Sequence, residues 1–159
     1  MESHLATRPQ KTVFPIEEQI RLRSLATEQI KEYFLPDTGI EKILLIGSSV
    51  KESFGQYQPP GFRGSLFSDF DFIVYVKDGY AIPSQLTREP NGKPFSRGDL
   101  NLAYRIRNFV EGRFDAEIFF VRNSSLLDLT IREEGERAGI PMGTESLHPN
   151  IVVFETGTS

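Results

Sequence analysis

The chain lacks cysteine and tryptophan altogether, and it has only two histidines among its 159 residues. The absence of cysteine excludes disulfides, thiolate metal sites and a cysteine nucleophile. His4 and His148 lie near the two ends of the chain in polar or proline-containing surroundings, where a solvated surface histidine is expected. A site built on histidine or cysteine is therefore not expected.

Long apolar runs and an excess of positive charge are also missing. No apolar stretch reaches the length needed to cross a membrane, and residues 1–12 lack the apolar core of a signal peptide. The formal net charge is −4 and the pI is about 5.3, so the surface as a whole should not attract nucleic acid. We expect a cytoplasmic protein with no membrane partner.

What the chain does have is enough apolar material for one domain. Hydrophobic residues make up 38% of the sequence and include 13 phenylalanines, which suffices for a core without disulfides. We expect a flexible N-terminal arm over residues 1–13 and a single domain over 14–159. Proline- and glycine-containing loop insertions are expected near residues 56–67 and 81–95.

Apolar spacing predicts an alternation of helices and strands. Residues 16–35 have helical spacing, and Pro15 stands at a favoured helix start. Apolar runs predict strands at 43–46, 69–76, 113–121 and 151–154. Further helical segments are predicted at 50–54, at 96–110, and at 125–138 with Leu127 and Ile131 facing inward. This order indicates an α/β domain with one helix-covered sheet, and the pattern leaves open whether the sheet is parallel or mixed.

Four acidic residues stand on two of the predicted strands. Asp69 and Asp71 begin one strand, and Asp115 and Glu117 lie on another. Because side chains alternate along a strand, each pair shares a face. If the strands are neighbours, these carboxylates converge and repel one another, and a divalent cation would relieve the repulsion. Oxygen ligands suit Mg²⁺, and two such ions can clamp the attacking and leaving oxygens of a phosphoryl or nucleotidyl transfer.

A turn after the first predicted strand supplies a candidate phosphate site. Gly47, Ser48 and Ser49 follow a buried run and offer backbone N–H groups and hydroxyls to a phosphate, and Lys51 adds a positive charge. Each of these features can also be explained without a bound ligand. Aspartate is common at strand entries, Glu117 could face solvent, and Asp115 could pair with Arg113 or Arg107. The combination of turn and acids favours a phosphate-handling site.

The segments Leu44–Ser49 ("LLIGSS") and Ser68–Val74 ("SDFDFIV") together resemble the signature of the nucleotidyltransferase superfamily, which includes DNA polymerase beta, the CCA-adding enzymes, aminoglycoside adenylyltransferases and the minimal nucleotidyltransferases. The resemblance spans residues 41–121 and implies an α/β (α+β) fold, a mixed sheet flanked by helices. It implies that Gly47 and Ser48 hold the triphosphate of an NTP and that Asp69 and Asp71 bind two Mg²⁺ ions.

The resemblance also implies a third acid that completes the metal site and helps to activate the acceptor hydroxyl, and it leaves open whether Asp115 or Glu117 has this role. The segment "RFD" fits the position where family members have an apolar residue followed by Asp, which favours Asp115. The longer apolar run "IFFV" after Glu117 fits the alternative. The preference is for Asp115. The chain departs from the family pattern between Ser48 and Asp69, where the segment "GQYQPPGFRGSLF" makes the loop unusually long.

The resemblance implies transfer of a nucleoside monophosphate from an NTP to a hydroxyl. The acceptor is unidentified, and a protein or small molecule is favoured over RNA. A partner protein or a second copy of the chain could take part in its recognition. The alternative is a catalytically inactive module that keeps the fold and binds nucleotide or a partner protein.

Overall fold

A computed structural model describes residues 9–62, 65–88, 103–137, 142 and 145–156. Its α-helices are α1 (Ile16–Phe34) and α2 (Leu129–Arg137), and short 3₁₀ helices η3 and η4 cover Asn123–Leu127 and Glu145–Leu147. The strands are β1 (Lys11–Val13), β2 (Ile40–Ile46), β3 (Gly55–Tyr57), β4 (Phe70–Val76), β5 (Thr87–Arg88), β6 (Ala103–Val110), β7 (Phe114–Arg122) and β8 (Ile151–Glu155). The predicted helix at 16–35 and the four predicted strands are confirmed, with small shifts in their ends.

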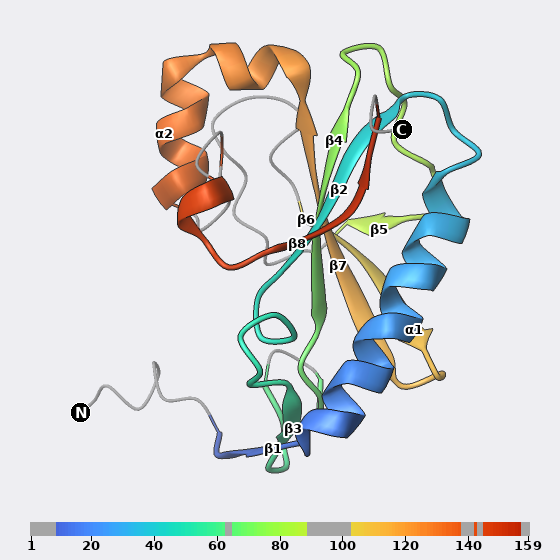
Figure 1. The fold of residues 1–159 in the computed structure, drawn as a ribbon, viewed down its shortest axis with the longest axis vertical. Coiled ribbons are helices and arrows are strands. Elements are labelled where there is room, and N and C mark those ends of the chain that lie inside the picture. Colours follow the sequence, from blue (N-terminus) through green and yellow to red (C-terminus); the bar gives the residue numbers. More distant parts are fainter. Residues whose placement is uncertain (1–8, 63–64, 89–102, 138–141, 143–144, 157–159) are drawn as a thin grey trace.

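Six strands form one sheet in the order β5-β6-β7-β4-β2-β8. Strands β4 and β7 are parallel, and every other neighbouring pair in this sheet is antiparallel. The sheet is therefore mixed, which confirms the expected α+β class and settles the point that the sequence pattern left open. Figure 1 shows α1 on one side of this sheet and α2 on the other.

Helix α1 covers one face of the sheet with residues at helical spacing. Leu22, Ala26, Ile30 and Phe34 are buried, and they pack in one cluster with strand residues such as Phe120. Glu17 and Glu18 lie in the first turn and Lys31 in the last, where they complement the helix dipole. This face forms the larger part of the core and holds the central strands in place.

The opposite face carries a smaller cluster that includes Ile73, Tyr75, Ile131 and Met142. Burial, together with Glu145, raises the pKa of Tyr75, which stays neutral and donates a 2.5 Å hydrogen bond to Glu145. The predicted helix at 125–138 is observed as η3 followed by α2, and the side chain of Ile131 is buried as expected. The inward placement of Leu127 is wrong: η3 ends there, and the residue is 89% exposed.

The predicted helix over residues 96–110 is wrong where the structure describes it. Residues 103–110 form strand β6, which pairs antiparallel with β7, and residues 96–102 lie outside the described residues. The apolar residues at 102, 106 and 109 fit helical spacing, but Tyr104 and Ile106, two residues apart, pack against the core as in a strand. Pairing with a distant strand overrode the local helical pattern.

Two segments assigned to loops pair with each other. Strand β1 lies in the predicted N-terminal arm, and β3 includes Gln56 and Tyr57 from the predicted loop insertion. They form a small antiparallel sheet in which Lys11 lies opposite Tyr57. Figure 1 places this small sheet at the N-terminal end of α1. Both segments are too short and polar for a pattern to reveal them.

None of the helices in the described ranges is long and apolar enough to span a membrane.

Gly55 is predicted to be essential for the pairing of β1 with β3. A Cβ atom at this position would lie 2.1 Å from the backbone oxygen of Thr12. We expect Gly55→Ala to loosen β1 and to raise amide hydrogen exchange at residues 11–14, measured by mass spectrometry. Gly79→Ala is the matched control, since a Cβ there meets nothing within 4 Å. Equal exchange in the two variants would contradict this account.

Candidate functional site

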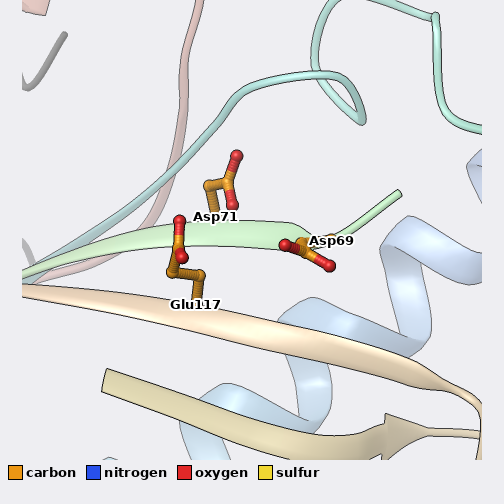
Figure 2. A group of neighbouring side chains, drawn as sticks. All are labelled: Asp69, Asp71 and Glu117. Atoms are coloured by element: carbon orange, nitrogen blue, oxygen red, sulfur yellow. The ribbon is translucent and has the colours of Figure 1, made fainter. Parts of the chain in front are cut away.

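Three carboxylates from two neighbouring strands meet on one face of the sheet. Asp69 immediately precedes β4, Asp71 lies within it, and Glu117 lies opposite Asp71 on β7. One ligand oxygen from each lies within 4.8 Å of the others, and all three side chains are half-buried. Figure 2 shows these side chains on the two adjacent strands. This oxygen-only set fits a hard divalent cation such as Mg²⁺.

The turn after β2 approaches one of these carboxylates closely. Ile46, the last residue of β2, pairs with Asp71, and Gly47 follows with a positive φ of 84°. A Cβ at Gly47 would lie 2.5 Å from Oδ2 of Asp71. The oxygen of Gly47 accepts hydrogen bonds from the N–H groups of Val50 and Lys51, each at 3.1 Å, so the predicted turn is present. The backbone angle favours glycine at position 47, and a Cβ there would displace the Asp71 carboxylate.

The acids and the turn line one cavity of about 300 Å³. Of the residues that the sequence suggested for nucleotide binding, Gly47, Ser48 and Lys51 line it. Ser49 does not: its side chain is buried, at 1% exposure, outside the lining. The remaining lining residues are Lys11, Ser53, Tyr57, Phe62, Phe67, Ser68, Asp69, Asp71 and Glu117.

Asp115 lies outside the group of carboxylates that Glu117 joins, although both residues contact Arg105. Oδ2 of Asp115 accepts hydrogen bonds from Arg105 at 3.0 Å and Arg107 at 3.2 Å, and its Oδ1 accepts one from the backbone N–H of Asn108 at 2.8 Å. Asn108 has a positive φ of 54° and lies where the β6–β7 register shifts. The structure therefore gives Asp115 a bulge-stabilising role and brings Glu117, the less preferred alternative, to Asp69 and Asp71. The suggested pairing of Asp115 with Arg107 is observed, whereas Arg113 contacts Glu111.

Besides Lys11, which lines the cavity, Arg105 is a charged residue at this site that the sequence interpretation missed. It lies opposite Glu117 on β6, and only 6% of its side chain is exposed. Its Nη1 lies 3.3 Å from Asp69 Oδ2, and its Nη2 lies 3.4 Å from Glu117 Oε2. The alternation of Arg105 and Arg107 with Tyr104 and Ile106 is the sequence signal that could have revealed it.

The guanidinium of Arg105 lowers the repulsion between the acids it contacts. Coulomb interactions are stronger away from bulk water, so a buried cation among carboxylates has a large local effect. The same contacts hold Asp69 and Glu117 in defined positions, which favours a preorganised set of oxygen ligands.

Removing the charge of Arg105 is expected to destabilise the fold strongly. Arg105→Leu leaves buried carboxylates without their cation, and we expect a loss of about 3 kcal/mol or more in the free energy of unfolding, measured in urea. Arg21→Leu is the matched control. Arg21 also pairs with two carboxylates, those of Glu18 and Glu111, but at the exposed surface, where the effect should be much smaller. Similar losses in the two variants would contradict the role given to Arg105.

A second prediction concerns the contact between Gly47 and Asp71. Gly47→Ala should weaken Mg²⁺ binding, measured by isothermal titration calorimetry, because the added methyl group displaces the carboxylate. Gly112→Ala is the control: Gly112 also has a positive φ, 67°, but a Cβ there meets nothing within 4 Å. Both variants carry a similar backbone cost of about 1 kcal/mol, so only the clash differs. Unchanged Mg²⁺ affinity in Gly47→Ala would contradict the expectation that the added methyl group displaces the Asp71 carboxylate from its binding position.

Comparisons with known proteins do not assign the chain to a family. No protein-family model and no curated protein matches it. Among solved structures, the chain is similar to a "putative nucleotidyltransferase from Sulfolobus solfataricus", with 16% identity over 91% of this chain and 89% of that chain and a TM-score of 0.40.

Proposed function

We propose that the protein is a nucleotidyltransferase that transfers a nucleoside monophosphate from an NTP to a hydroxyl group. One observation carries this proposal: the carboxylate group of Asp69, Asp71 and Glu117 shares a cavity with the glycine turn at the end of β2. A metal site alone would fit many reactions. The turn beside it adds backbone and hydroxyl donors for phosphate, which makes a nucleotide the fitting substrate.

The proposed reaction is a displacement at the α-phosphorus. An oxygen of the acceptor forms a bond to this phosphorus, and the bond from the phosphorus to the oxygen shared with the β-phosphate breaks. Pyrophosphate leaves with that electron pair, and the acceptor hydroxyl gives its proton to a carboxylate or to solvent. Little covalent chemistry is needed from the protein, so positioning and charge dominate.

Each part of the cavity has a role in this proposal. Asp69, Asp71 and Glu117 hold the divalent cations, of which two Mg²⁺ ions are expected, and the cations would neutralise the phosphate charge that develops during transfer. Gly47 and Ser48 hold the outer phosphates through backbone N–H and hydroxyl groups, and Lys51 adds positive charge at the same turn. The acceptor is proposed to be a protein or a small molecule rather than RNA, given the acidic pI.

Removing any ligand carboxylate should abolish transfer. Asp69→Asn, Asp71→Asn and Glu117→Gln are each expected to lower pyrophosphate release from labelled NTP by about 10²–10³-fold, with a cell lysate as the source of acceptor and Mg²⁺ present. Glu32→Gln, at an exposed position on α1, is the control and should leave the rate unchanged. Absence of pyrophosphate release with all four NTPs would sink the proposal.

The contacts of Arg105 favour a second candidate, a module that binds nucleotide or a partner protein without turnover. Its guanidinium already supplies positive charge to Asp69 and Glu117, as a metal ion would. Under this alternative, Mg²⁺ would not raise the melting temperature, and Asp71→Asn would leave partner binding intact. The nucleotidyltransferase candidate instead predicts that Mg²⁺ raises the melting temperature and that Asp71→Asn lowers the rate of transfer.

A further inference from the structure

We propose that the long segment before β4 is the nucleoside-binding wall of the acidic cavity. This wall consists of β1, β3 and the described residues between β3 and Asp69, which are 58–62 and 65–68, and it is called the aromatic lobe below. The proposal rests on the proposed function and deepens it, because it names the part of the chain that holds the base and sugar of the NTP.

Backbone hydrogen bonds fold the aromatic lobe into a defined structure. The N–H of Tyr57 donates to Leu66 O at 2.6 Å, and the N–H groups of Phe62 and Ser65 donate to each other's oxygens at 2.8 and 3.1 Å. The N–H of Gln58 donates to Gln10 O at 2.8 Å, which ties the lobe to the chain before α1. The bond between Gln58 and Gln10 joins distant parts of the sequence, whereas the others close turns within the lobe. Together they give the lobe a defined backbone structure.

The lobe is joined to the acids at Ser68. Its N–H donates to Gly55 O at 2.9 Å, and its Oγ accepts a hydrogen bond from the N–H of Gly55 at 3.0 Å. Ser68 is buried and directly precedes Asp69. The position of the lobe is therefore fixed relative to the first ligand carboxylate.

The aromatic lobe contributes three rings to the cavity that also contains the acids, those of Tyr57, Phe62 and Phe67. Phe67 packs on Phe114 of the core, and Tyr57 is largely buried. Phe62 is half-buried, and its ring packs against that of Tyr57 with a centroid distance of 5.4 Å and an interplanar angle of 45°, which constrains its position. A nucleobase can stack on a partly exposed aromatic ring that is held in place, and such stacking does not depend on which base it is.

Positive charge accompanies the rings on the lobe side. Lys11 Nζ lies 5.4 Å from the centroid of Tyr57 and 3.5 Å from Ser68 Oγ, and Lys51 lies on the turn side of the cavity. A ligand that matches this cavity has an aromatic part, an anionic part and an affinity for a cation held by carboxylates. A nucleoside triphosphate combines all three, and the cavity of about 300 Å³ is at the lower end of the usual size for ligand sites.

The test compares two probes in the presence of Mg²⁺: α,β-methylene analogues of the four NTPs, and inorganic tripolyphosphate, which lacks the nucleoside. We expect the wild-type protein to bind at least one analogue about tenfold more tightly than tripolyphosphate, measured by isothermal titration calorimetry. Phe62→Leu keeps an apolar side chain but removes the ring, and it should remove most of this preference. Phe62→Tyr should keep it, which separates stacking from loss of structure.

Leu66→Ala serves as the control within the lobe, because Leu66 is 42% exposed and does not line the cavity. Equal binding of both probes by the wild-type protein would overturn the role of the lobe while leaving phosphate binding, and the proposed function, in place. Retention of the preference by Phe62→Leu would also overturn it. If neither probe binds, both the proposed function and this inference are wrong.

Discussion

In the β4–β7 pair, Asp71 lies directly opposite Glu117, and the candidate site depends on this parallel register. Side chains alternate along a strand, so a slip of one residue would turn one carboxylate to the α1 side of the sheet. The register is held from that side by buried neighbours such as Phe72 and Ile118, which are opposite each other one residue further along. The packed core therefore holds these acids close together although their negative charges repel one another.

Charge balance is the second condition for this arrangement. Two strands bring Asp69, Asp71 and Glu117 together, and the neighbouring strand β6 supplies Arg105 on the same face. Asp115 lies beyond them and is held by the same arginine. Removing one partner from such a buried network lowers the free energy of unfolding by more than an exposed ion pair contributes, because the remaining charge stays away from water.

Local patterns in the sequence predicted the parts that depend on neighbouring residues. The spacing of α1, the apolar runs of the central strands and the turn at Gly47 are encoded within a few residues, and the structure has them at the expected places. The pairing of Asp69 and Asp71 on one face also follows from strand alternation alone. Lys11 carries no such local signal, and the alternation around Arg105 indicates only a strand. The contacts of both side chains are with other segments of the chain.

The sequence by itself determined helix α1, strands β2, β4 and β7, the glycine turn and the first two acids, since periodicity and backbone preference act locally. Only the tertiary structure decided that residues 103–110 form a strand, that Glu117 joins the acids instead of Asp115, and that the segment before β4 folds into an aromatic lobe. Each of these depends on pairing between distant strands, and a strand gains its hydrogen bonds and its buried face only from such partners.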